Sequence, residues 1–574
     1  MDLLRNADEA SGEEVVDLPI IPQGPPADQM CNLFPLERNA AAESPPGRQV
    51  ARRYIHLDLK GAPPRPSYLI QLFTFVAEWG ASGLLIEWED MVPFTGRLEV
   101  VRSPTCYSRD EVEAILAAAH SAGLDVIPLV QTFGHLEFVL KHQSFARYRE
   151  RKDEVLCLCP LEEGSIELAK ELIQQTRSMH PDATYIHIGC DEVFNLGDCA
   201  RCRAKAEAAG RQALFLDFVE PLVKECAALG VRALLWHDML ECTDADTLKQ
   251  RLAADADVVV WNYSTVTSVT SEEWMGLSSA FPRVWGASAF KGASEPDAVW
   301  PPMKHHMMNH MAWLDRCETT EMHAVILTGW SRFNHTAALC ELLPAALPTL
   351  AVCLSVLCYG ECSESLHRAA LERLQLEHLP LDPSGHDFDS WQHQLPTAAS
   401  TFPGSAVFSA VARLHSCRTL LTKAEELHRV FCPPHTARLS PQSWQQVLNM
   451  ATLVSERLGV LRPQIYEHML PVLFEADVDE FVGAKLDPVS QKAGELVQKM
   501  TKLLEMHAPK PREKRPPRNS SCSSCLKKLN LDKSPYDQDG DNSNADWSPT
   551  SGAGCTECMG KSRGSRAPVL SMSV

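Results

Sequence analysis

The chain has 574 residues, of which 45% are hydrophobic, and its formal net charge is -20. This length allows roughly two to four domains, or one large barrel with an accessory region, and the hydrophobic content supports a buried core. The excess of acidic residues excludes a general nucleic-acid-binding protein, because it repels phosphate unless basic residues gather in one place.

The first part of the chain has neither helical nor strand periodicity. Residues 1–50 are rich in Pro, Ala and acidic residues, and we expect a disordered leader. No run of about 20 uncharged apolar residues occurs, and the acidic N-terminus does not read as a secretory signal. We therefore expect no membrane association and a cytoplasmic location, in which most of the 20 cysteines are free thiols.

Eight short apolar runs follow the leader. Each run is too short for an independent helix and lacks polar alternation, which is typical of a strand buried on both faces. They span residues 54–59, 83–88, 125–130, 184–189, 232–236, 257–261, 283–288 and 324–330.

Helical patterns separate these runs. The residues from Ser108 to Glu111 match a capping box, and the apolar residues that follow share one helical face until Gly123. Eight alternations of strand and helix predict an α/β fold, a (β/α)8 TIM barrel over residues 51–345 with right-handed crossovers. An open doubly wound sheet uses the same alternation, but it usually has a glycine-rich phosphate turn where this chain has LDLKGAPPRP.

The pattern changes after the predicted barrel. Residues 346–506 contain long helical stretches without strand patterns, which predicts a helical accessory region, and the composition of residues 507–574 predicts a disordered tail. The basic cluster at residues 510–518 could act as a nuclear import signal, although most such runs are solvated linkers. On the first interpretation of this cluster, the nucleus is a second expected compartment.

Cys-x-x-Cys pairs occur at three places. Cys199-x-x-Cys202 follows the fourth run, and the tail holds Cys522-x-x-Cys525 and Cys555-x-x-Cys558. The 29 residues between the two tail pairs exceed the spacing of about 15 to 20 that is usual in zinc sites. We therefore predict no metal site.

The ends of the predicted strands carry polar and aromatic residues. In a (β/α)8 barrel the active site lies at the C-terminal ends of the strands. Four consecutive runs contain Trp near their ends, which predicts an aromatic cup for a sugar ring; alternatively, each Trp plugs the barrel beneath its loops. The candidates for binding are Asp58, Lys60, His135, His187, Trp236, Asp238, Trp261, Tyr263, Trp285 and Trp330, and Glu87, Glu89 and Arg332 also stand at strand ends.

Two adjacent carboxylates end the fourth run, at Asp191 and Glu192. Neighbouring residues of a strand point to opposite faces, so the pair can serve one ligand only where the strand ends and the backbone turns. Close like charges raise one pKa, which would leave one ionised and one protonated carboxyl group in a coupled pair near neutral pH. Alternatively, such dipeptides often sit on solvated helix ends.

The segment HIGCDE resembles the His-x-Gly-Gly-Asp-Glu signature of glycoside hydrolase family 20, the β-N-acetylhexosaminidases, with Cys190 in place of the second Gly. LDLKGAPP, GLLIEWEDMVPF, VIPLVQTFGHLEFVLKH, ASAFKGA and LTGWSRF are also similar to that family, over roughly residues 53–500. The resemblance implies an exo-acting enzyme without a metal or other cofactor. Its substrates would be glycans or glycoconjugates that end in N-acetylgalactosamine or N-acetylglucosamine.

The resemblance also implies a retaining mechanism in which the substrate's acetamide oxygen attacks the anomeric carbon. Asp191 would orient the acetamide and stabilise its charge, and Glu192 would protonate the leaving oxygen and then activate water. Tyr263 would bind the acetamide. The walls of the pocket would be Trp236, Trp261, Trp285 and Trp330.

Other expectations depend on position alone. His135 and His187 would support the pair, and Asp58 and Lys60 would hold sugar hydroxyls because they end the first strand. The resemblance to the family makes a homodimer an expected partner, and an exposed apolar face on the helical region would permit one. Two alternatives to this enzyme remain open: a hydrolase or lyase of another barrel family, which could be metal-dependent, and a non-catalytic carbohydrate-binding or scaffold protein.

Overall fold

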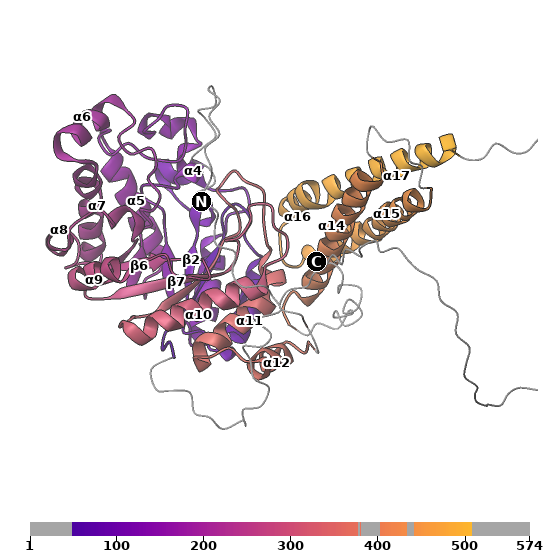
Figure 1. Cartoon of the computed structure of the whole chain (residues 1–574). Helices are drawn as coiled ribbons and strands as arrows, with labels where there is room; N and C mark the ends of the chain where they lie inside the picture. The colour runs from indigo at the N-terminus through magenta and orange to yellow at the C-terminus, as the bar shows by residue number, and fades with distance from the viewer. Residues whose placement is uncertain (1–48, 377–378, 380–401, 433–440, 508–574) are drawn as a thin grey trace, which may run out of the picture. The chain divides into compact units, whose positions relative to one another are not determined.

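The computed structural model describes residues 49–376, 379, 402–432 and 441–507 (Figure 1). The predicted leader and tail, the basic cluster and the tail cysteine pairs lie outside these residues, apart from residues 49, 50 and 507. No helix in the described ranges is long and apolar enough to cross a membrane.

Eight parallel strands form a closed barrel in which each strand pairs with the next and the last pairs with the first. The predicted (β/α)8 fold is therefore confirmed. The strands are β1 (Arg53–Asp58), β2 (Gly83–Glu87), β3 (Asp125–Leu129), β4 (Tyr185–His187), β5 (Arg232–Trp236), β6 (Ala256–Trp261), β7 (Val284–Lys291) and β8 (Val325–Gly329).

Helices lie around the outside of the strands (Figure 1). The capping box of α3 is present, because the Ser108 hydroxyl accepts from the Glu111 amide and the Glu111 carboxylate accepts from the Ser108 amide. The longer helices are α2 (Pro66–Glu78), α3 (Arg109–Ser121), α5 (Ser165–Met179), α6 (Ala200–Ala209), α7 (Arg211–Ala228), α8 (Ala245–Arg251), α9 (Ser271–Ala280), α10 (Met303–Thr319) and α11 (Leu343–Tyr359).

Short helical turns follow several strands and shape the C-terminal face of the barrel. They are η3 (Glu89–Met91), η4 (Gly96–Val101), α4 (Glu137–Leu140), η5 (Gln143–Tyr148) and η6 (Asp238–Leu240).

The strands separate two regions of buried side chains, as expected for strands buried on both faces. One region lies between the barrel and its helices and continues into the helical region. The other fills the barrel itself, so the barrel is packed rather than open. Its members include Tyr54, Leu85, Ile127, Leu129, Leu234, Trp236, Val259, Trp285, Ala287 and Ile326.

The described residues after the barrel are helical, as the pattern predicts. α14, α15 and α17 lie side by side (Figure 1). The predicted boundary at residue 345 falls inside α11, which packs on α10 and β7, and the division at this residue stays a prediction. The remaining helices are α12 (Glu364–Arg373), α14 (Ser405–Phe431), α15 (Pro441–Met469), α16 (Glu475–Phe481), the π-helical η8 (Val482–Leu486) and α17 (Asp487–His507).

A buried arginine joins the loop after β8 to α16. The Arg332 guanidinium donates to both carboxylate oxygens of Glu480, at 2.6 and 2.7 Å, and to the carbonyl of Lys60 at 2.9 Å. Paired in this way, Arg332 fixes the loop that carries Trp330 and His335.

Candidate active site

The two predicted carboxylates lie in a sharp turn after β4. The backbone of Gly189, Cys190 and Glu192 has φ angles of 67°, 68° and 45°, a left-handed conformation that residues with side chains rarely adopt. The turn brings both carboxylates to one imidazole: His135 Nε2 lies 3.5 Å from Asp191 Oδ2 and 3.2 Å from Glu192 Oε2. Such strain clusters at functional sites.

Cys190 stands where the family signature has glycine. Its φ of 68° explains why glycine suits this position. The thiol is buried, where it lies 3.3 Å from the hydroxyl of Thr132 and donates to the carbonyl of Ile188 at 3.4 Å. Two polar partners therefore hold the side chain inside the protein, away from the carboxylates.

His135 is a positive charge between the two carboxylates. Burial alone lowers the pKa of this imidazole, but Asp191 and the hydrogen bond to Glu192 outweigh burial and raise it to about 10. The His135 side chain is 16% exposed, against 11% for Asp191 and 9% for Glu192. All three side chains are therefore mostly buried, and a small part of each is accessible to solvent. At neutral pH the imidazolium holds the pair together.

Asp191 titrates near neutral pH. Burial raises the pKa of this carboxyl group to about 7; the charge of His135 opposes the rise, and the charges of Asp238 and Glu192 add to it. Burial, rather than the neighbouring charge of Glu192, is therefore the main cause of the raised pKa of Asp191, and the predicted coupling of the pair stays a prediction. That Asp191 is ionised and Glu192 protonated during the reaction stays a prediction.

Asp238 positions the pair. Its Oδ2 accepts a hydrogen bond from the backbone amide of Glu192 at 2.8 Å, and its Oδ1 accepts one from the indole of Trp261 at 3.2 Å. Burial raises the pKa of Asp238. Through these two contacts Asp238 holds the backbone of Glu192 and the indole of Trp261; Asp238 is also partly exposed, and its predicted contact with the sugar stays a prediction.

Gly134 allows the turn to form. A Cβ atom on this residue would lie 2.3 Å from the backbone oxygen of Asp191. We expect Gly134→Ala to lower the free energy of unfolding by about 1–3 kcal/mol, the usual cost of overpacking, and to lower kcat because Asp191 must move. Thermal unfolding and kcat measure the two effects. Gly276→Ala in the interior of α9, where no atom lies within 4 Å, is the control; it should leave kcat unchanged and raise the free energy of unfolding by up to about 1 kcal/mol, because alanine is the better helix former. An unchanged kcat in Gly134→Ala would show that this contact does not place Asp191.

Three aromatic residues near the pair are partly exposed. The rings of Trp261 and Tyr263 stack with centroids 5.5 Å apart. Burial raises the pKa of the Tyr263 hydroxyl, and the charges of Asp191 and Glu192 raise it further, so this hydroxyl lies within their electrostatic reach. Trp330, at the end of β8, lies with its ring 5.3 Å from the Lys60 ammonium. These three residues form an aromatic edge to the site.

The other two tryptophans are buried. Trp236 is 1% exposed and packs on His187, with ring centroids 4.4 Å apart, beneath Trp330. His187 is also fully buried; burial lowers its pKa to about 3, and its Nδ1 accepts a hydrogen bond from the Gly189 amide at 3.0 Å. Trp236 and His187 therefore support the turn from below.

The prediction that Trp285 lines the mouth of the barrel is wrong. β7 continues to Lys291, so Trp285 is the second of its eight residues and lies far from its C-terminal end. Its ring centroid is 5.4 Å from that of Tyr54 and 5.3 Å from that of Tyr185, residues at the starts of β1 and β4. Trp285 thus fills the N-terminal part of the barrel, at the end opposite the loops, so neither the aromatic cup nor a plug beneath the loops describes it.

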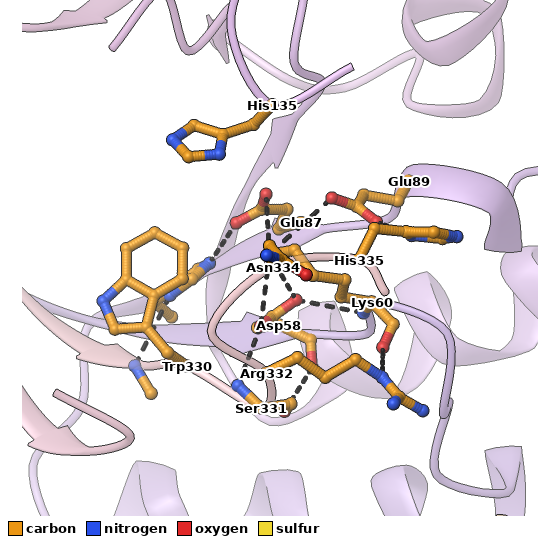
Figure 2. Close-up of polar contacts among 12 residues, drawn as sticks. Asp58, Lys60, Glu87, Glu89, His135, Trp330, Ser331, Arg332, Asn334 and His335 are labelled. Carbon is orange, nitrogen blue, oxygen red and sulfur yellow. Dashed lines mark hydrogen bonds and ion pairs between the residues drawn. The ribbon is translucent and has the colours of Figure 1, made fainter. Parts of the chain in front are cut away.

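A buried charge network lies near His135 (Figure 2). Lys60 Nζ lies 3.4, 3.5 and 3.6 Å from carboxylate oxygens of Asp58, Glu87 and Glu89. His335 Nδ1 lies 2.6 Å from Glu89 Oε2. We call these five residues the Lys60 network. All five side chains are at most 7% exposed, so each charge depends on its neighbours.

The Lys60 network sets different pKa values for its two glutamates. Burial would raise the pKa of Glu87, but Lys60 and His56 lower it to about 2. Burial raises the pKa of Glu89 to about 7 although Lys60 and His335 oppose it. Glu89 also has a left-handed backbone, with a φ of 45°.

Asp58 and Lys60 are therefore engaged inside the protein. The Asp58 carboxylate accepts from the Ser331 amide at 2.8 Å in addition to its contacts with Lys60. That these two residues hold sugar hydroxyls stays a prediction, and it requires the hydroxyls to join an existing network. Sequence reasoning noticed Glu87 and Glu89 at the strand end but missed His335, for which no signal exists in the sequence.

A polar hollow of about 530 Å³ opens next to the Lys60 network. Its lining includes Asp90, Lys141 and His335 on the barrel side, together with Arg332 and Glu480. Neither Asp191 nor Glu192 lines it. The hollow is therefore a neighbour of the carboxylate pair rather than its pocket.

Two carboxylates joined by an imidazolium, with aromatic side chains beside them, thus lie at the C-terminal end of a closed (β/α)8 barrel, where the active sites of this fold are found. Residues 87–279 match the family described as glycosyl hydrolase family 20, catalytic domain. The chain is 35% identical over 475 residues to Hexosaminidase D of Homo sapiens, covering 79% of this chain and 94% of that protein. It is 39% identical over 325 residues to Hexosaminidase D of Bos taurus, covering 55% and 94%.

These relatives place the chain in glycosyl hydrolase family 20. A solved β-N-acetylhexosaminidase from Bacteroides fragilis is 15% identical, with a TM-score of 0.46, covering 57% of this chain and 70% of that one. Family membership makes the protein a glycoside hydrolase and sets aside both alternatives, an enzyme of another barrel family and a non-catalytic protein.

Proposed function

We propose that the protein is an exo-acting β-N-acetylhexosaminidase that releases terminal non-reducing N-acetylgalactosamine or N-acetylglucosamine from glycans or glycoconjugates. The observation that carries this proposal is the turn after β4, which brings Asp191 and Glu192 to the same imidazole. The aromatic edge of Trp261, Tyr263 and Trp330 supports a sugar ring as the ligand.

The proposed reaction is substrate-assisted. The acetamide oxygen of the bound sugar attacks the anomeric carbon while Glu192 gives its proton to the departing glycosidic oxygen, which breaks the glycosidic bond and leaves a cyclic oxazolinium ion. Ionised Asp191 orients the acetamide and stabilises its positive charge. Water then attacks the same carbon and loses a proton to Glu192, while the bond from this carbon to the acetamide oxygen breaks and its electron pair restores the neutral acetamide; the acid is regenerated and the sugar is released with its configuration retained.

His135 and Asp238 prepare this chemistry. The imidazolium of His135 lies close enough to stabilise negative charge on both carboxylates, and Asp238 fixes the backbone at Glu192. Because both residues act through the pair, we assign them positioning roles.

The pKa of Asp191 predicts a pH dependence. Below about pH 7 this carboxyl group gains a proton and loses the negative charge that the oxazolinium ion requires. We therefore expect kcat/KM to fall about tenfold per pH unit on the acid side of this value, because kcat/KM reports the ionisations of the free enzyme. A pH profile on an aryl substrate measures it. A profile that stays level down to about pH 5 would contradict this role for the Asp191 charge.

A panel of four substrates tests the proposed function. The p-nitrophenyl β-glycosides of N-acetylglucosamine and N-acetylgalactosamine should be cleaved, whereas the matched β-glucoside and β-galactoside, which lack the acetamide, should not. The ratio of the first two also gives the preference at C4. Cleavage of the β-glucoside as fast as of its acetamido analogue would refute the proposal.

Further properties remain proposals that rest on the sequence. These are a location in the cytoplasm with the nucleus as a second compartment, the lack of nucleic-acid and membrane partners, and a homodimer.

A further inference from the structure

Three cysteines and a glutamate meet on the C-terminal side of the barrel. Cys159 Sγ lies 3.6 Å from Cys202 Sγ and 3.8 Å from Cys199 Sγ, and the carboxylate of Glu150 completes a group whose ligand atoms all lie within 4.8 Å of one another. Cys159, Cys202 and Glu150 are at most 3% exposed. The group is separate from the carboxylate pair and from the Lys60 network.

The distances between the sulfur atoms fit a tetrahedral zinc ion. Four ligands placed about 2.3 Å from Zn²⁺ lie about 3.8 Å from one another, which matches the separations of 3.6 and 3.8 Å between the sulfur atoms. A disulfide would use only two of the three thiols, and these cysteines are free. The two sulfur atoms of a disulfide would also stand only about 2 Å apart.

Glu150 supplies a second, independent observation. Its Oε1 accepts a hydrogen bond from the Cys199 amide at 2.9 Å, which fixes the carboxylate against the cysteines. Its Oε2 is buried without a hydrogen-bond partner. An unpartnered buried carboxylate oxygen is costly, and a metal ion among the three sulfur atoms would remove that cost.

A second group of possible metal ligands also has buried carboxylate oxygens without a hydrogen-bond partner, on Glu89 and Asp90, but it differs from the cysteine group in the lysines that lie beside it. Glu89, Asp90 and His335 also lie close together, but Lys60 Nζ is 3.6 Å from Glu89 and Lys141 Nζ is 3.2 Å from Asp90. Lysine ammonium groups already provide the positive charge there. Among the described residues, the cysteine group is therefore the better site for a metal ion.

The cysteine group joins two loops that carry the carboxylate pair and its imidazole. Glu150 and Cys159 lie in a hairpin of the loop after β3, and the chain on either side of His135 is held by this hairpin: Leu158 donates to the Phe133 carbonyl at 3.1 Å, and Leu136 donates to the Leu156 carbonyl at 3.0 Å. Cys199 caps α6, at the end of the loop that begins with Asp191 and Glu192.

We propose that Glu150, Cys159, Cys199 and Cys202 bind one structural Zn²⁺ ion, which fastens the loop after β3 to the loop after β4. The ion takes the thiolate forms of the cysteines and releases their protons on binding. All four ligand positions come from the protein, which is typical of structural rather than catalytic zinc. The inference does not depend on the proposed glycosidase reaction.

Metal analysis of the purified 574-residue chain tests the proposal. To exclude the tail cysteines, the protein carries serine at positions 522, 525, 555 and 558. We expect one equivalent of zinc per chain, lost in Cys159→Ala and kept in Cys157→Ala. Cys157 is the matched control because it lies in the same hairpin and is equally buried, 2% against 2%, but stands outside the group.

We call the protein with serine at the four tail positions the tail-serine protein. A second measurement uses this protein alone, so that its result does not depend on whether Cys159→Ala folds. Exchange of the ion for Co²⁺ should give the intense near-ultraviolet absorption of cobalt bound to thiolates, and titration with a mercurial reagent should release the zinc. Zinc that stays at one equivalent in Cys159→Ala would overturn the assignment of the ligands. A folded tail-serine protein that takes up no zinc, with all three thiols free or two of them joined in a disulfide, would overturn the site itself.

Discussion

Replacing Glu192 by Gln should lower kcat for an N-acetyl-β-hexosaminide with a poor leaving group by about 10²- to 10⁴-fold, the range that general acid catalysis supplies. The amide keeps the size of the side chain but has no acidic proton for the departing oxygen. A substrate with a strongly acidic phenol as its leaving group needs less protonation and should lose much less rate. Steady-state kinetics on a series of aryl leaving groups measures the difference.

Glu163→Gln is the control for this prediction, because Glu163 is exposed and lies in the loop after β3, whereas Glu192 lies in the loop after β4. It should leave the whole series unchanged. If Glu192→Gln cleaves an unactivated disaccharide at the rate of the wild-type enzyme, Glu192 is not the acid.

Asp191→Asn should lower kcat by about 10²- to 10³-fold, the usual effect of removing one group that stabilises charge in a transition state. Asp191 acts on the acetamide rather than on the leaving group, so we expect the loss to be similar for good and poor leaving groups. The same series of substrates measures it. The substitution should also remove the acid limb of the pH profile, because the group with the raised pKa is gone.

Asp182→Asn, at an exposed position before β4, is the matched control and should keep wild-type kinetics. A loss in Asp191→Asn that grows steadily with the pKa of the leaving group would give Asp191 the acid's role and contradict the assignment of the pair.

The barrel was predictable because its strands are buried on both faces, which makes each strand a continuous apolar run. The same property hides where a strand ends. β7 is buried along its whole length, so nothing in VWGASAFK shows that the strand continues to Lys291 and carries Trp285 at its start. The boundary at residue 345 had no signal either, because α11 is nearly as apolar as a strand.

The carboxylate pair was predictable for a different reason. Asp191 and Glu192 are adjacent in sequence, so their meeting at the imidazole of His135 depends on a local turn. The Lys60 network depends on segments far apart in the chain: His335 meets Glu89 across 246 positions. A sequence shows neither that contact nor the left-handed backbone of Glu89 and His135 that aims the side chains.

The cysteine group shows the same limit. Cys199-x-x-Cys202 was visible as a motif, but a metal site needs further ligands, and spacing pointed only to the tail pairs. Cys159 and Glu150 reach the motif through the hairpin of the loop after β3, which is a tertiary contact. The expectation of no metal in the sequence analysis and the zinc site proposed above therefore differ for a physical reason.

The central claim is that the substrate's own acetamide is the nucleophile, positioned by Asp191 while Glu192 protonates the leaving oxygen. The most direct test replaces the N-acetyl group of one aryl glycoside by its mono-, di- and trifluoroacetyl analogues, which make the acyl oxygen progressively less nucleophilic. We predict that kcat falls steeply along the series and that the first sugar released keeps the β configuration. A kcat that does not change along the series, or release of the α anomer first, would contradict the claim.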